Sequence, residues 1–193
     1  LDRIEGTTGS SSWANDNKTL FYTKKDEVTL RAYQIYKHRL GETDDTLVFE
    51  ETDDTFGVAV YKSKSRKYII IACYSTLTNE YHILNADHAE GDFTPFQDRI
   101  RGLEYSISHY NNHFYILTNK DKATNFKLMM TRETSTRVEN WLEVIPHRKD
   151  VLLENIDIFK NYLVISERSN GLNQIRVKRW DGSADYYLPF DNE

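Results

Sequence analysis

The sequence predicts an all-β fold of four small, four-stranded antiparallel sheets, and three observations support this prediction. Apolar runs recur every 46 to 48 residues, and each follows a group of turn-forming residues. Segments that alternate apolar and polar residues flank each run, and a period of two is typical of strands rather than of amphipathic helices. Aromatic residues make up 13% of the chain, and their side chains suit pleated sheets.

One strand in each repeat is almost entirely apolar. This is expected where neighbouring sheets cover both of its faces. The turns before these strands are rich in Asn, Asp and Ser, whose side chains bond to nearby backbone and tolerate a left-handed φ. The apolar runs cover residues 20–22, 68–71, 114–117 and 162–165.

Three further segments complete each repeat. Four short antiparallel strands every 40 to 50 residues or so are the signature of a β-propeller blade. Pro95 lies in a fourth strand, and proline is confined to edges because it cannot donate to the ladder. The first strands include 58–61, 105–108 and 156–159, the third strands 33–36, 81–84, 126–129 and 174–177, and the fourth strands 46–49, 94–96, 141–144 and 186–188.

The predicted blades use the whole chain, with limits near residues 5–52, 53–101, 102–148 and 149–193. Propellers close with four to eight blades. The chain does not begin with Met, so we expect an arc of a larger ring. The two end faces of an unclosed arc are apolar, and we expect further sequence or another copy to cover them.

Composition argues against two classes of partner. The formal net charge is −5 and no cluster of Lys and Arg dominates, so we expect no nucleic-acid partner. No apolar run approaches the ~20 residues that span a bilayer, so we expect no membrane partner. Cytoplasmic and periplasmic locations are both compatible with the sequence.

The single cysteine, Cys73, forms no internal disulfide and is expected to be a small buried apolar residue.

No catalytic, metal-binding or cofactor-binding residue is predicted in this chain. A nucleophile elbow requires the pattern G-x-S-x-G, and none of the eight glycines lies in it. His109 and His113 have the i, i+4 spacing of ligands on one helix face, but they flank a predicted hairpin turn. We therefore expect the six histidines to be surface or inter-strand residues.

The order and spacing of several motifs resemble the N-terminal propeller domain of the prolyl oligopeptidase family, most closely oligopeptidase B (protease II). The resemblance covers essentially the full chain. The most specific stretches are Ala123-Thr124-Asn125-Phe126-Lys127-Leu128 and Glu167-Arg168-Ser169-Asn170-Gly171-Leu172, and others include Ser12-Trp13-Ala14-Asn15-Asp16-Asn17-Lys18 and Arg101-Gly102-Leu103-Glu104-Tyr105.

This resemblance implies a function. Family members combine a seven-bladed propeller with an α/β-hydrolase catalytic domain, and the propeller admits short peptides but excludes folded proteins. Oligopeptidase B cleaves after Arg or Lys. The chain would then be about four blades of such a propeller, a non-catalytic segment of a serine endopeptidase. Its partners would be its own downstream catalytic domain and short peptide substrates.

The resemblance also singles out four charged residues, which are proposed as inter-blade or inter-domain salt bridges rather than as catalytic groups. Arginine can hold a carboxylate through two hydrogen bonds, which suits such contacts. The alternative is that these charges belong to solvated loops. The four residues are Arg101, Glu104, Glu167 and Arg168.

Two other functions stay open at this stage. The chain could belong to a propeller that binds proteins and has no peptidase activity, because fold alone does not determine function. It could also belong to a prolyl oligopeptidase that cleaves after Pro. A G-x-S-x-G pattern after Glu193, followed by Asp and His, would separate the peptidases from the binding module.

Overall fold

The computed structural model describes residues 3–190, which form sixteen strands and two short 3-10 helices. The strands make four separate four-stranded sheets, and every neighbouring pair of strands within a sheet is antiparallel. The chain divides into two compact units. The first comprises Leu1–Leu103 and Thr136–Glu139, and the second comprises Glu104–Ser135 and Asn140–Glu193.

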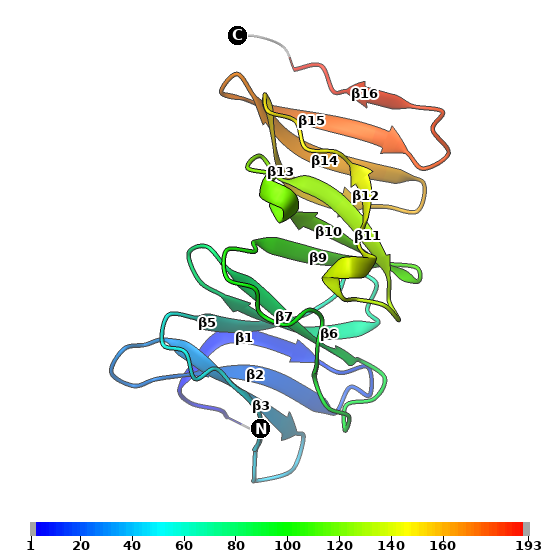
Figure 1. Cartoon of the computed structure of the whole chain (residues 1–193). Coiled ribbons are helices and arrows are strands. Elements are labelled where there is room, and N and C mark those ends of the chain that lie inside the picture. Colours follow the sequence, from blue (N-terminus) through cyan, green and yellow to red (C-terminus); the bar gives the residue numbers. More distant parts are fainter. Residues whose placement is uncertain (1–2, 191–193) are drawn as a thin grey trace. The chain divides into compact units, whose positions relative to one another are not determined.

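The first unit contains two sheets in which the strands pair in sequence order (Figure 1). Its last strand, β8, has only two residues and forms the edge of the second sheet, where Pro95 is tolerated. The first sheet consists of β1 (Thr7–Trp13), β2 (Thr19–Lys25), β3 (Ala32–Arg39) and β4 (Thr46–Glu50), and the second of β5 (Gly57–Lys62), β6 (Tyr68–Tyr74), β7 (Asn79–Asn85) and β8 (Thr94–Pro95).

The core of the first unit lies between these two sheets. Strand β5 contacts β1, β2 and β3, so the first strand of one sheet packs over the face of the other. Phe21 and Ile35 from the first sheet and Ile69, Ile71 and Cys73 from β6 are all buried in one apolar cluster. Each sheet therefore covers an apolar face that the other could not bury alone.

The second unit repeats this arrangement with two further sheets. Both again pair their strands in sequence order. One sheet consists of β9 (Tyr105–Tyr110), β10 (His113–Thr118), β11 (Lys127–Arg132) and β12 (Leu142–Ile145), and the other of β13 (Val151–Ile158), β14 (Tyr162–Ser169), β15 (Leu172–Arg179) and β16 (Asp185–Tyr187). The helices are η1 (Lys120–Lys122) and η2 (Val138–Asn140).

The core of the second unit lies where β10 and β13 meet. Leu117 and Leu128 from one sheet and Leu153, Leu163 and Ile165 from the other form one buried cluster. The second strand of each sheet again supplies fully buried side chains, because residues on both of its faces are covered.

The prediction of an all-β fold with four four-stranded antiparallel sheets is confirmed. Each predicted apolar run lies in the second strand of a sheet, in β2, β6, β10 or β14. Each predicted blade range contains one observed sheet, although the end of the last range, residues 191–193, lies outside the described residues. Five predicted strand residues fall just outside their strands: Phe96 after β8, Phe126 before β11, Trp141 before β12, Phe159 after β13 and Leu188 after β16.

The hairpin turns explain where the strands end. Asn17, Asn111 and Asn170 adopt a left-handed backbone, with φ of 56°, 53° and 51°. Asparagine tolerates this conformation better than most residues do. His109 and His113 flank the turn at Asn111, so they lie on paired strands and not on one helix face.

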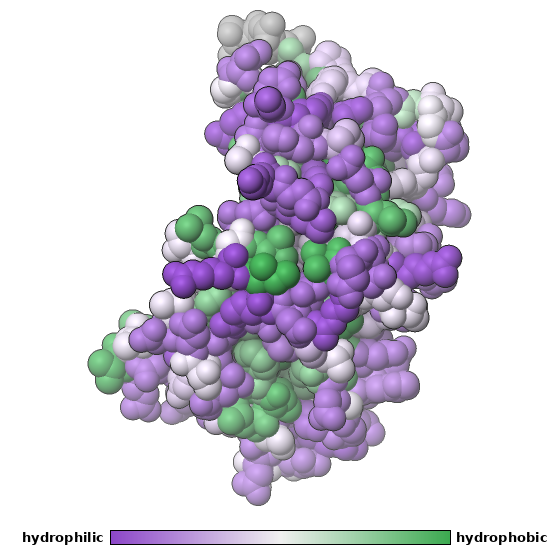
Figure 2. All heavy atoms as spheres, in the orientation of Figure 1, coloured by the Kyte–Doolittle hydropathy of each residue, from purple (hydrophilic) through white to green (hydrophobic). Residues whose placement is uncertain are grey.

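The face of the molecule shown in Figure 2 is mostly hydrophilic, with hydrophobic side chains in separate patches. No helix within residues 3–190 combines the length and apolar character that a membrane crossing requires.

Truncation of the core tests the role of the second strands. Ile71 is fully buried on β6, so Ile71→Ala removes apolar contacts and leaves a cavity. We expect the free energy of unfolding to fall by about 2–5 kcal/mol, measured by urea denaturation. The control Val28→Ala changes a side chain that is 89% exposed and should stay within about 0.5 kcal/mol of wild type. Equal effects of the two substitutions would contradict the packing described here.

Candidate functional site

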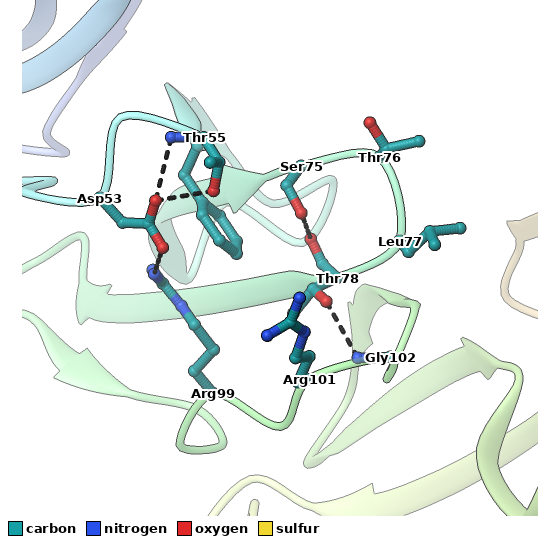
Figure 3. A pocket seen from close by; sticks show the side chains of 10 residues that line it. Asp53, Thr55, Ser75, Thr76, Leu77, Thr78, Arg99, Arg101 and Gly102 are labelled. Atoms are coloured by element: carbon teal, nitrogen blue, oxygen red, sulfur yellow. Dashed lines mark hydrogen bonds and ion pairs between the residues drawn. The ribbon is translucent and has the colours of Figure 1, made fainter.

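A pocket of about 620 Å³ opens in the first unit at one end of the second sheet (Figure 3). Its wall comes from three segments: the turn between β6 and β7, the link that precedes β5, and the link that follows β8. Two arginines from the last of these links, Arg99 and Arg101, line the pocket but differ in their surroundings.

Arg99 is held by two carboxylates. Its Nε donates to Glu80 Oε2 at 2.6 Å, and its Nη2 donates to Glu51 Oε2 at 2.5 Å. The guanidinium also lies over the ring of Phe56, 3.7 Å from the ring centroid. Glu51 is only 5% exposed, so this contact places a buried carboxylate against a cation. Arg99 therefore ties the link after β8 to the link before β5 and to β7.

Arg99 and Glu80 keep their charges despite partial burial. Burial lowers the pKa of Arg99, but hydrogen bonds to Glu51 and Glu80 outweigh this effect and raise it. Burial raises the pKa of Glu80, but hydrogen bonds from His82 and Arg99 hold it below its ordinary value. Burial raises the pKa of the nearby Cys73 thiol, and the charges of Glu51 and Glu80 raise it further, so this thiol is not activated as a nucleophile.

A second arginine fixes the link before β5. Nη1 of Arg31 donates to the carbonyl oxygens of Phe56 at 2.8 Å and Asp53 at 3.2 Å. The Thr55 hydroxyl donates to Asp53 Oδ1 at 2.7 Å, and this hydrogen bond helps to hold the pKa of Asp53 below its ordinary value. The carbonyl oxygens of Asp53 and Phe56 in the pocket wall thus already have a partner.

Arg101 projects from a tight turn beside this cluster. The N–H of Leu103 donates to the carbonyl of Ile100 at 3.0 Å, and Gly102 between them has a φ of +82°. A glycine in this conformation at the third position is the pattern of a type II turn. The N–H of Gly102 also donates to Thr78 Oγ1 at 3.0 Å, which joins the turn to the β6–β7 turn (Figure 3).

The second unit contains a comparable charged cluster around Glu167 on β14. This carboxylate is fully buried and accepts hydrogen bonds from Arg148 and from the Tyr187 hydroxyl, the latter at 2.8 Å. Arg176 bridges to Asp185 through its Nε at 2.6 Å. Hydrogen bonds from Arg176 lower the pKa of Asp185 to about 2. The cluster fixes β16 and the link after β12 to the body of the last sheet.

The four charged residues predicted from the sequence have different surroundings. Glu167 lies in the buried cluster just described. Arg168 pairs with Glu154 at 2.6 Å, within the last sheet. Glu104 Oε1 accepts a hydrogen bond from the Asn119 side chain at 3.1 Å. In the part of the chain that the structure describes, Arg101 has no such partner, and no two of the four residues pair with each other.

The residues that organise these clusters were missed by the sequence analysis, although a signal for them exists. Glu51, Arg99 and Arg148 are 48 and 49 residues apart, which matches the repeat of the strands. Each lies in the link between the last strand of one sheet and the first strand of the next. A charged residue at one fixed position of the repeat could therefore have been read as a link-anchoring residue.

The pocket presents guanidinium and hydroxyl donors, and such donors suit an anionic group. Among residues 3–190 no group of three or more His, Cys, Asp and Glu side chains is arranged to hold a metal ion.

Comparison with known proteins places the chain in a family. Residues 1–190 match the model of the prolyl oligopeptidase N-terminal β-propeller domain. The dipeptidyl aminopeptidase BI of Pseudoxanthomonas mexicana is 36% identical over 96% of this chain and 26% of its own length. Protease 2 of Moraxella lacunata is 34% identical over 88% of this chain and 24% of its own length.

Comparison with solved structures supports the same family assignment. Oligopeptidase B from Leishmania major superposes with a TM-score of 0.89 at 28% identity, over 100% of this chain and 28% of its own. The Trypanosoma brucei enzyme, with covalently bound antipain, gives 0.90 at 27% identity, over 99% of this chain and 28% of its own. The chain thus spans about a quarter of the length of these relatives. It belongs to the prolyl oligopeptidase family, as part of the N-terminal β-propeller domain.

Removal of the Arg99 guanidinium tests the charged cluster. Arg99→Gln leaves Glu51 buried without its cation, and we expect the free energy of unfolding to fall by about 3 kcal/mol at pH 7. Arg39→Gln is a matched control, because the ion pairs that Arg39 forms with described residues are exposed, and the substitution should lower the free energy of unfolding by less than about 1 kcal/mol.

The pH dependence of the free energy of unfolding, measured for wild type and for Arg99→Gln, gives a second test of the cluster. The pKa of Glu80 is lower in the folded chain than the value of about 4.3 in the unfolded chain. Its contribution to stability is therefore present above about pH 4.3 and is lost as the pH falls through the folded-state pKa. The difference in free energy of unfolding between wild type and Arg99→Gln should therefore become smaller at acid pH. A difference that stays constant from pH 7 to pH 3 would contradict this role of the carboxylates.

Proposed function

We propose that this propeller member of the prolyl oligopeptidase family is the non-catalytic, substrate-gating segment of a serine endopeptidase similar to oligopeptidase B. The enzyme would hydrolyse short peptides after Arg or Lys. The main support is the close superposition of the chain, over nearly its full length, on two oligopeptidases B with TM-scores of 0.89 and 0.90. The reactive serine would lie in the roughly three quarters of the relatives' length that this chain does not match.

The role proposed for the blades is steric. Each unit packs two sheets around a core of buried aliphatic and aromatic side chains, which makes a stiff wall. The first strand of each blade would line a channel that a single extended peptide can enter and a folded domain cannot. Opening and closing of the propeller against the catalytic domain would admit the peptide and then exclude water.

A second candidate activity has an observation of its own. The relative with 36% identity is named a dipeptidyl aminopeptidase, a name that describes release of dipeptides from a free N-terminus. The two activities differ in whether the enzyme requires that free amino group. A propeller that binds proteins without peptidase activity, and a peptidase that cleaves after Pro, are the remaining outcomes of the test below.

The specificity is tested on the full-length protein with three short peptides. One has a blocked N-terminus and an internal Arg or Lys, one has a free N-terminus, and one has an internal Pro in place of the basic residue. We expect cleavage of the blocked peptide after its basic residue, measured by mass spectrometry of the products. A fluorophosphonate probe should label one serine, outside residues 1–193.

Each other outcome contradicts the proposal in a recognisable way. Release of dipeptides from the free N-terminus alone would favour the aminopeptidase activity. Cleavage only after Pro would identify the other branch of the family. The absence of both cleavage and serine labelling would favour the binding module.

Size gating is tested with one cleavable sequence in two settings. The sequence is supplied as a short free peptide and as an exposed loop of a stably folded carrier protein. We expect the peptide to be cleaved and the loop to stay intact, because the carrier cannot pass the propeller. The unfolded carrier is the control for the sequence itself. Cleavage of the folded carrier at a rate similar to that of the peptide would exclude gating.

A further inference from the structure

Arg101 differs from Arg99, which lines the same pocket, and from Arg31, which binds backbone of the pocket wall, because its charge has no partner within the described residues. Arg99 contacts two carboxylates and an aromatic ring, and Arg31 donates to backbone carbonyls. Within residues 3–190 no hydrogen bond or ion pair reaches the Arg101 guanidinium, and Figure 3 draws it without a dashed line. Its five N–H donors are therefore available for a ligand.

The backbone holds Arg101 in place despite its exposure. Its turn is closed by the Leu103-to-Ile100 hydrogen bond, and Gly102 is bonded to Thr78 Oγ1 at 3.0 Å. The N–H of Asn79 donates to the carbonyl of Leu103 at 3.1 Å, which ties the turn to the start of β7. A side chain that projects from a fixed turn loses less entropy on binding than one on a mobile loop.

Two exposed apolar residues lie on the segments that hold this free cation. Leu77, 64% exposed, lines the same pocket from the β6–β7 turn, and Ile100, 42% exposed, directly precedes Arg101 in the same turn. Thr78 accepts a hydrogen bond from Gly102 and retains its own hydroxyl proton as a donor. An arginine with exposed aliphatic neighbours and a few hydroxyl groups is typical of a protein-binding surface.

We propose that Arg101, Leu77 and Ile100 form a docking site for an acidic side chain carried by the remainder of the same protein, outside these 193 residues. This inference rests on the proposed function, because it assumes that the protein has the length of its relatives, about four times that of this chain. The guanidinium pairs with the carboxylate, ideally through two hydrogen bonds, and the two aliphatic side chains pack against the residues beside it. The pocket is thus one fixed point at which the propeller contacts the rest of the protein.

The test places a photo-cross-linking residue, benzoylphenylalanine, at Leu77 in the full-length protein. Leu77 is exposed, so the substitution should not disturb the fold. After irradiation, mass spectrometry should find a cross-link from this position to a segment outside residues 1–193 of the same polypeptide. The matched control carries the probe at Leu40, an exposed leucine beyond the opposite end of β3 from Arg31, and should not give this cross-link.

The contribution of Arg101 is isolated by a second substitution in the Leu77 probe protein. Arg101→Gln should reduce the cross-link yield several-fold, whereas Arg66→Gln, at the other end of β6, should leave the yield unchanged. Cross-links that join only residues within 1–193, cross-links between two copies, no cross-link, or an unchanged yield in Arg101→Gln would each overturn the proposal. None of these outcomes depends on peptide cleavage or serine labelling, so failure of the docking site is distinguishable from failure of the proposed function.

A charge swap provides the rescue. The cross-linked segment identifies the acidic residue, and its replacement by Arg should lower the yield as Arg101→Gln does. Combination of that replacement with Arg101→Glu should restore the yield, because the ion pair is rebuilt with reversed polarity. Failure of the double variant, with both single variants folded, would show that no direct pair exists.

Discussion

The packing of one small sheet against the next is the constraint on which the structure depends. A four-stranded sheet of this size has an apolar face and cannot bury it alone. Phe21 on β2 and Ile71 on β6 are both buried because a neighbouring sheet covers them, and Leu163 on β14 is buried in the same way in the second unit. The stability of each blade is therefore shared with its neighbour, as in other repeat proteins.

This constraint decides where charged groups can lie. The space between sheets is filled by aliphatic and aromatic side chains, so ionised residues gather where one sheet ends and the next begins. Arg99 with Glu51, and Arg148 with Glu167, occupy such positions. Buried pairs of this kind add little net stability compared with apolar residues, but loss of one partner is costly. Their effect is to fix the path of the link, and hence to present neighbours such as Arg101 in a defined orientation.

Most of the fold could be predicted from the sequence, but few of the residues that build the candidate site could. The period of the apolar runs located all four second strands, and Asn111 marked a hairpin through its tolerance of a left-handed backbone. Phe126 was placed in a strand because its apolar side chain continues the alternation, but its φ of 58° breaks the strand there. The pairing of Glu51 with Arg99 could not be predicted, because the two residues are distant in sequence and no local pattern indicates which side chains face each other. Arg101 was singled out by resemblance, but only the structure shows which of its neighbours are already paired.

The complete burial of Cys73 has a practical consequence. It is the only cysteine among the 193 residues, and its side chain is completely enclosed between the two sheets of the first unit. A thiol reagent can reach the sulfur only when those sheets separate, because burial both blocks access and disfavours the thiolate. The rate of alkylation in native buffer therefore measures how often this pair of blades opens, with no residue substituted.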